Sequence, residues 1–216
     1  MNQIYTVGHS SHNIDYFLKL LNSHSISCLV DVRSTPYSKY TPQFNMREIK
    51  RILNFNKIYY IFMGNEFGAR RKDKELYSEE GYLDFEKVSR SSLFISGMDR
   101  VKTGLEKGFN IALMCKERDP IDCHRNILVA REFHKQNYKV YNILEDSKIQ
   151  NQEHIEKRLL DMYFPNRYQY TLFDNQRKND PELINEAYKL RNKDIGYRLI
   201  EEKEPLENEV IYHRIH

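Results

Sequence analysis

The sequence predicts an α/β fold: a mostly parallel sheet of about five strands, helices on both faces and a helical C-terminal extension. Two observations carry this prediction. Short β-prone runs alternate along the chain with segments whose apolar residues recur at helical spacing. In addition, the run ISCLVDV at residues 26–32 has no polar alternation, which is typical of a strand buried on both faces of a parallel sheet. Strands that alternate with helices in this way are joined by right-handed crossovers.

The predicted strands are short, rich in β-branched and aromatic residues, and bounded by turn or charged residues. They span residues 3–8, 26–32, 57–63, 109–115 and 139–144. The predicted helices have apolar residues three or four positions apart. They cover residues 14–21, 46–53, 94–105, 122–137 and 155–163. The connection from Gly64 to Asp84 contains the charge run ARRKDKE and exceeds an ordinary loop, so we expect a lid, a binding loop or a solvated segment there.

The composition changes after Pro165, where the chain becomes more polar. We therefore expect one α/β domain over residues 1–165 and an extension over residues 166–216. Within the extension a single helix is predicted at about 181–193, with Asp180 as its cap and Pro181 at its first position.

Composition and charge exclude several classes of protein. The longest apolar runs are far shorter than the roughly 20 residues of a membrane helix, so no membrane partner is expected. A formal net charge of +3 is too small to indicate a nucleic-acid or membrane partner, although it allows a local basic cleft. The three cysteines, together with an N-terminus that lacks the pattern of an export signal, favour free thiols in a reducing cytoplasm. Cys28, inside an apolar strand, is expected to pack in the core.

Chemically active residues follow three of the predicted strands, at the point where each strand ends. They are His9 and Ser10 after the first strand, Asp31, Arg33 and Ser34 after the second, and Cys115 and Glu117 after the fourth. Because ligands bind outside the carboxyl ends of the strands in open parallel sheets, we expect these groups to meet at one edge. Buried polar groups cost free energy unless they are paired, so packing alone does not explain such a collection.

The segment CKERDPIDCHRN continues this site. Asp122 is a good N-cap, which would place Cys123, His124 and Arg125 in the first turn of the next helix. Because the positive end of a helix dipole favours a thiolate there, Cys123 is the better candidate nucleophile.

The remaining roles follow from residue type. Cys115 is the second candidate nucleophile, and His124 or His9 would act as general acid or base. Glu117 would orient the reacting groups or exchange a proton, and Arg33 and Arg125 would clamp a phosphate or carboxylate. The neighbouring polar residues Ser10, Asp31 and Ser34 complete the predicted substrate-binding set, and no cofactor is assigned.

Three alternatives stay open. Arg70 and Arg71, in the basic loop 70–74, would contact phosphates if the protein binds or processes nucleic acid. A zinc site would use Cys115, Cys123, His124 and His9, although this spacing matches no standard zinc pattern. A reversible disulfide between Cys115 and Cys123 is the third alternative.

Four motifs occur in a fixed order along the chain: YTVGHS, LVDVRSTPYS, the Pro42-Gln43-Phe44 element and LMCKERDPIDCHR. Together they resemble the pattern of the prokaryotic domain of unknown function 488 family. The resemblance extends from the N-terminus to about residue 145, and the segment INEAYKLRNKDIGYR is similar to the ending of longer members. It implies a shared site that includes Cys115, Cys123, His124 and Arg125.

A weaker likeness connects the chain to rhodanese and low-molecular-weight phosphatase folds. Those enzymes pair an Asp-x-Arg strand with a catalytic cysteine at a strand-to-helix turn. Here Cys115 lies ten residues before Arg125, with Pro120 between them, so neither activity is transferred.

The sequence therefore predicts a cytoplasmic enzyme, a cysteine-dependent hydrolase or transferase, that acts on an anionic small molecule of phosphate- or nucleotide-like character. A nucleic-acid-binding or processing protein is the first alternative, and a metal-binding module is the second.

Overall fold

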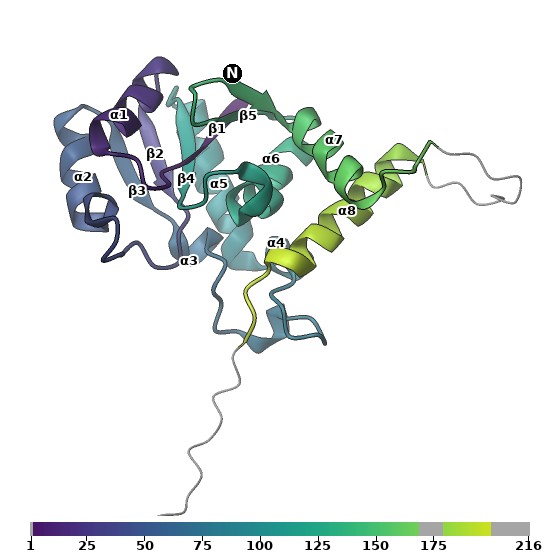
Figure 1. The fold of residues 1–216 in the computed structure, drawn as a ribbon. Helices are drawn as coiled ribbons and strands as arrows, with labels where there is room; N and C mark the ends of the chain where they lie inside the picture. Colours follow the sequence, from purple (N-terminus) through teal and green to yellow (C-terminus); the bar gives the residue numbers. More distant parts are fainter. Residues whose placement is uncertain (1, 169–178, 200–216) are drawn as a thin grey trace, which may run out of the picture.

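The computed structural model describes residues 2–168 and 179–199, and a six-stranded sheet forms its centre (Figure 1). The strands are β1 (Gln3–Gly8), β2 (Cys28–Asp31), β3 (Tyr59–Phe62), β4 (Ile111–Cys115), β5 (Lys139–Ile143) and β6 (Ile149–Asn151). Their order is β3-β2-β4-β1-β5-β6, and every pair is parallel except β5 with β6. The predicted α/β class is confirmed, and the short antiparallel β6 is the strand that the sequence did not indicate.

Helices cover both faces of this sheet, and side chains that alternate along the strands fill the two cores. On one face, α1 (Ile14–Ser23) and α2 (Met46–Phe55) pack against strand residues such as Val7 and Leu29. On the other face, α5 (Ser92–Glu106), a π-helix (Arg125–Ala130), α6 (Arg131–Lys135) and α7 (Gln152–Tyr163) pack against Ile4 and Val30. The carboxyl ends of β1, β2 and β4 therefore lie side by side between two packed layers.

The predicted helix over residues 122–137 is wrong at its beginning. Asp119 accepts a hydrogen bond from the Ile121 backbone N–H at 3.1 Å and caps a 3₁₀ turn at Pro120–Asp122. Cys123 then takes an extended conformation, and helical backbone begins at His124 and continues into a π-helix at Arg125–Ala130. Asp122 is thus the end of a 3₁₀ turn rather than an N-cap, because the Asp-Pro pair starts a separate turn earlier. The thiol of Cys123 consequently lies before the helix and not in its first turn.

The extension contributes α8 (Asp180–Ile195), which lies along α7 (Figure 1). Its N-cap is Asn179 rather than Asp180, because the Asn179 side chain forms a capping box with Glu182. Asn192 fastens α8 to the main body by accepting from one backbone N–H and donating to one carbonyl, each at 2.8 Å. Parts of the predicted extension, residues 169–178 and 200–216, lie outside the described residues, and the division into two units stays a prediction.

The long connection after β3 contains regular structure. It includes α3 (Gly64–Phe67) and the 3₁₀ turn Lys74–Leu76, and it is followed by α4 (Phe85–Ser89). The Ser34 hydroxyl accepts a hydrogen bond from the Arg70 backbone N–H at 2.9 Å, and the buried Tyr77 donates to the Arg71 carbonyl at 2.8 Å. The connection is therefore held against the loop that follows β2, where a further 3₁₀ turn spans Pro42–Phe44. Among the residues that the structure describes, no helix combines the length and the apolar character needed to cross a bilayer.

Candidate active site

An open cavity of about 590 Å³ lies at the carboxyl ends of β1, β2 and β4. Cys115, Glu117 and His124 line its base, and His9 and Arg33 line the side formed by β1 and β2. The end of α8 and the residues that follow it add to the wall. The cavity lies at the sheet edge where the sequence predicts that these polar groups come together.

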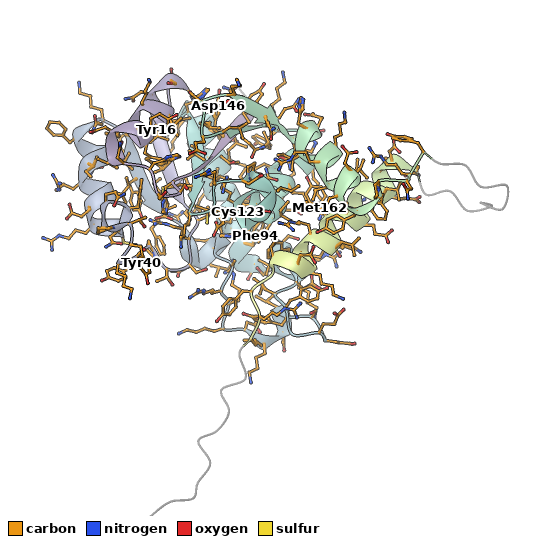
Figure 2. All side chains as sticks on the ribbon, in the orientation of Figure 1. Tyr16, Tyr40, Phe94, Cys123, Asp146 and Met162 are labelled. Atoms are coloured by element: carbon orange, nitrogen blue, oxygen red, sulfur yellow. The ribbon has the colours of Figure 1, made fainter. Side chains whose placement is uncertain are left out.

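Two thiols, a carboxyl group and an imidazole form a compact group, which we term the cysteine cluster: Cys115, Glu117, Cys123 and His124. All four potential ligand atoms lie within 4.8 Å of one another. His124 Nδ1 is 3.9 Å from Cys115 Sγ and 4.0 Å from Cys123 Sγ, and Cys123 Sγ is 2.8 Å from a Glu117 carboxyl oxygen. In Figure 2, Cys123 lies in the interior of the molecule, and it is 1% exposed.

The orientation of His124 is fixed by the main chain. Its Nε2 lies 3.0 Å from the Val32 carbonyl oxygen, which can only accept a hydrogen bond. Nε2 therefore carries the hydrogen and donates, and in the neutral ring Nδ1 presents a lone pair to the two thiols. Val32 itself is buried directly after β2, so the sheet edge sets this orientation.

Ionisation in the cluster is unequal. Burial raises the pKa of Cys115, and the neighbouring Cys123 and Glu117 raise it further. Burial also opposes a thiolate at Cys123, but the hydrogen bond from Cys115 and the charges of Arg125 and His124 hold the Cys123 pKa below its usual value. Burial and Cys123 raise the pKa of Glu117. Of the two thiols, Cys123 therefore ionises more readily than Cys115.

Arg125 holds the backbone of this cluster in place. Its guanidinium is 0% exposed and donates to the carbonyls of Glu117 at 2.7 Å and Arg118 at 3.2 Å. Its backbone N–H also points to Cys123 Sγ at 3.5 Å. The predicted anion-binding guanidinium thus contacts the loop that carries Glu117, and it is not among the groups that line the cavity.

Asp31 and Arg33 form the second ordered group at the site. The Arg33 guanidinium donates to both carboxyl oxygens of Asp31, at 2.9 and 2.6 Å, to the Phe44 carbonyl at 2.8 Å and to His9 Nε2 at 3.0 Å. These bonds use four of its donors, so about one of the five remains for a ligand. The fully buried Asp31 also accepts from the Tyr60 hydroxyl at 2.7 Å. Asp31 therefore positions Arg33, and Arg33 presents a single edge to the cavity.

His9 is held as a neutral ring. A guanidinium only donates, so the Nε2 that faces Arg33 carries a lone pair, and Nδ1–H donates to the Ser10 carbonyl at 2.9 Å. Burial, together with the charge of Arg33, lowers the His9 pKa to about 4. The ring also stacks on Phe44 with 4.3 Å between centroids. His9 thus belongs to the group around Arg33. The alternative zinc site was predicted to use His9 as its fourth ligand, but the structure brings Glu117, and not His9, together with Cys115, Cys123 and His124.

Cations that the sequence analysis did not single out also line the cavity. Lys39 and Lys116 are exposed there, and they join Arg70 of the basic loop. Within residues 2–168 and 179–199, these three make no ion pair; Lys39 and Arg70 instead lie over the rings of Tyr40 and Tyr197. The position of Lys116 directly after Cys115 was a usable signal, whereas Lys39 lies in an irregular loop whose path the sequence does not define.

The other predicted residues have supporting positions. Ser34 lines the cavity and holds the loop at Arg70, and Ser10 offers its carbonyl to His9. Arg71 donates to the carbonyls of Asn65 and Glu66, so of the two arginines only Arg70 reaches the cavity. Cys28 is buried in the core as predicted, and all three cysteines are free.

Comparison with known families identifies the segment that carries this site. The profile of the family described as domain of unknown function DUF488 matches residues 13–131. The chain belongs to this family. The matched segment contains the whole cysteine cluster together with Arg33 and Arg125, while the YTVGHS motif precedes it. No curated protein and no solved structure matches the chain.

Proposed function

We propose that the protein is a cytoplasmic enzyme, a cysteine-dependent hydrolase or transferase, that acts on an anionic substrate of phosphate- or nucleotide-like character. The observation that carries the proposal is the combination, in one cavity, of the cysteine cluster with three cations that have no carboxylate partner among the described residues: Lys39, Arg70 and Lys116. Unpaired cations in a concave site attract anions and raise their local concentration. The three free thiols are compatible with a reducing compartment.

The rim of the cavity favours a nucleotide over a small inorganic anion. Tyr37 and Tyr40 line it and are 70% and 80% exposed, and Tyr197, whose ring lies under the Arg70 guanidinium, lines it as well. Exposed aromatic rings provide stacking surfaces for a base, while nearby cations contact the phosphate. A volume of about 590 Å³ is within the range of small-molecule sites, which extends from about 300 to 1,000 Å³.

The roles of the residues follow from their positions. Lys116, Arg70 and the free edge of Arg33 would bind the anionic group, and the cluster at the base would carry the chemistry. Cys115 and His124 line the cavity, whereas Cys123 lies behind them, so Cys115 is the thiol nearest to a bound substrate.

Calorimetric titration with nucleoside mono- and diphosphates tests the binding half of the proposal. Lys116→Ala and Arg70→Ala should each weaken binding about tenfold or more, since a charge-assisted hydrogen bond contributes about 1.5–3 kcal/mol. The matched control is Lys50→Ala on the outside of α2, which should bind as wild type does. Equal binding by all three variants, or no binding by wild type, would contradict the proposal.

Turnover tests the chemical half. p-Nitrophenyl phosphate and p-nitrophenyl acetate serve as probes of phosphoryl and acyl transfer. We expect turnover of one probe that Cys115→Ala abolishes and that Cys28→Ala, which removes a thiol from the core, retains. Full turnover by Cys115→Ala would show that the reaction does not use the cluster.

A nucleic-acid substrate is the second candidate, because the exposed Tyr40 and Lys39 lie at an open rim beside Arg70. Figure 2 shows Tyr40 at the periphery of the molecule, where a strand could pass over it. This candidate predicts that a labelled single-stranded oligonucleotide binds with an affinity that falls steeply with salt and decreases in Arg70→Ala. Absence of binding at low salt would remove it.

A further inference from the structure

We propose that Cys115, Glu117, Cys123 and His124 bind one Zn²⁺ ion at the base of the cavity. This inference rests on the proposed function, since it assigns the chemistry of the same cluster, but it concerns a metal site and has its own test. It retains the anionic substrate and the dependence of the reaction on the cysteines, and it assigns the two thiols as ligands of the ion in place of nucleophiles.

The spacing of the ligand atoms supports a tetrahedral ion. With Zn–S and Zn–N bonds of about 2.3 and 2.0–2.1 Å, sulfur and nitrogen ligands of one tetrahedron lie about 3.6 Å apart. In the structure, His124 Nδ1 lies 3.9 Å from one cysteine sulfur and 4.0 Å from the other. These two sulfur–nitrogen distances need to shorten by only a few tenths of an ångström. The Glu117 carboxyl oxygen, 2.8 Å from Cys123 Sγ, must move outward by about 0.8 Å to take the fourth position, since zinc-bound sulfur and oxygen atoms lie about 3.6 Å apart.

The surroundings prepare these atoms as ligands. Metal-binding histidines usually donate their other ring N–H to a carbonyl or carboxylate, which fixes the ring and makes the ligand nitrogen more basic. His124 has this arrangement, because Nε2–H donates to the Val32 carbonyl and Nδ1 faces the sulfurs. The Arg125 backbone N–H directed at Cys123 Sγ would stabilise a metal-bound thiolate in the same manner.

The donor set selects the metal. Two thiolates and an imidazole favour Zn²⁺ over Mg²⁺ or Ca²⁺, which prefer oxygen ligands. Three buried or half-buried acidic groups within 4.8 Å, Cys115, Glu117 and Cys123, repel one another when ionised, and a divalent cation removes that repulsion. The nearby cation Arg125 does not neutralise these groups, because its guanidinium donates to backbone carbonyl oxygens.

The ion would be open to the substrate cavity. Cys115, Glu117 and His124 all line the cavity, while Cys123 closes the site from behind. A carboxylate ligand that faces a cavity can give way to water or to a substrate oxygen. A Zn²⁺ ion placed there would polarise a phosphoryl or carbonyl oxygen, or lower the pKa of a bound water.

The first test is the metal content of the full-length protein purified without chelator or affinity tag. Elemental analysis should give one zinc per chain. After removal with a chelator, Zn²⁺ added to the apoprotein should restore one equivalent and raise the melting temperature, and Co²⁺ should give the intense visible bands of a tetrahedral thiolate site. Apoprotein that binds neither Zn²⁺ nor Co²⁺ would overturn the inference.

Variants locate the ion. Cys115→Ala and Cys123→Ala should each lower zinc affinity at least about a hundredfold, since loss even of a second-shell partner costs up to that amount. Cys28→Ala is the matched control and should keep one zinc per chain. If the cysteine variants fail to fold, Glu117→Gln replaces them, because it retains side-chain shape and should alter the Co²⁺ spectrum. Unchanged zinc affinity and Co²⁺ spectra in all cluster variants would place any bound ion elsewhere and refute the site.

The two proposals fail separately. Lys116→Ala should weaken nucleotide binding and keep one zinc per chain. Wild-type protein that binds zinc but no nucleotide would retain the metal site and refute the proposed function. Conversely, wild-type protein that binds nucleotides but no zinc would retain the proposed function and refute the metal site.

Discussion

The neutral, buried His9 makes the protein sensitive to mild acid. Its ring is 1% exposed, and its Nε2 accepts a hydrogen bond from Arg33, so a proton added there would meet a guanidinium at 3.0 Å. Asp31 and Glu117 face the ring with opposite charge, but burial and Arg33 prevail and lower the His9 pKa to about 4. In the unfolded chain a histidine titrates at about 6.5.

The sign of the effect follows from these two values. Between pH 6.5 and 4 the unfolded chain takes up a proton that the folded chain does not, so the free energy of unfolding falls as the pH falls. Over pH 7 to pH 4 the gap of about 2.5 units corresponds to a loss of about 3 kcal/mol, at 1.36 kcal/mol per unit. Below about pH 4 the folded form is protonated too, and this contribution stops growing.

The perturbation that isolates this group is His9→Gln, whose amide oxygen can still accept from Arg33. Urea unfolding followed by circular dichroism at pH 7, 6, 5 and 4 gives the free energy of unfolding for wild type and variant. Wild type should lose about 3 kcal/mol more than His9→Gln between pH 7 and pH 4. His12→Gln, which changes a histidine of the neighbouring loop, serves as the matched control and should follow wild type.

Equal losses in wild type and His9→Gln would refute the reasoning, because they would show that His9 takes up its proton in the folded state as easily as in the unfolded one. Other groups titrate over this range, and the subtraction removes them since both proteins contain them. An NMR titration of the imidazole nitrogens supplies an independent readout of the same proton.

Three further changes test the framework of the site. Arg125→Met removes the donors to two carbonyls of the site loop and should lower the free energy of unfolding by about 3 kcal/mol in urea, whereas the exposed Arg51→Met should change it by less than about 0.5 kcal/mol. Gly8→Ala would place a Cβ 2.0 Å from the Glu117 carbonyl oxygen, so the loop that carries Glu117 must shift. Turnover should then fall about a hundredfold while the circular dichroism spectrum is retained, and turnover equal to that of wild type would contradict this. Asn192→Ala removes the partners of a buried N–H and a buried carbonyl and should lower the free energy of unfolding by about 2 kcal/mol in the same urea assay. An unchanged unfolding midpoint would show that this side chain does not hold α8.

The sequence was sufficient for the strands and for the edge at which the site lies. Apolar runs without alternation identify strands buried on both faces, and the carboxyl-end rule then places Cys115 and Glu117 beside Arg33. Only the antiparallel β6, three residues long with no fully buried side chain, gave too weak a pattern to be recognised.

Side-chain partners within the site could not be obtained in this way. The pattern offers His9 and Glu117 equally as neighbours of the two thiols. Of these two residues, only Glu117 contacts a thiol in the structure. His9 Nε2 accepts a hydrogen bond from the Arg33 guanidinium, whereas the loop after β4 folds back and places the Glu117 carboxyl group beside Cys123 Sγ. Such choices depend on distances of less than an ångström, which residue type and spacing do not define.

Residues from irregular loops were missed for a related reason. Lys39 and Tyr40 reach the cavity from a segment bounded by prolines, and Tyr197 reaches it from beyond the end of α8. Periodicity carries no information where the backbone is not periodic. The charge of Lys116 is plain in the sequence, but only the structure shows that no carboxylate in the described part of the chain pairs with it.

The π-helix at Arg125–Ala130 determines how the cysteine cluster would respond to a change in chain length. The hydrogen bonds of a π-helix join residues five apart, one more than in an α-helix. The segment therefore corresponds to an α-helix with one inserted residue. Because the wider turn takes up the extra residue locally, deleting one residue there would return the segment to an α-helix and leave the residues on either side in register. His124 and the packed residues from Arg131 onward would keep their relative orientation, and the imidazole would still face the two sulfurs. Deleting one residue from the α-helical turns that follow would instead rotate the two sides by about 100° relative to each other and turn the imidazole away from the sulfurs. The π-helix is therefore the one part of this helical segment in which a change of chain length leaves the site in place.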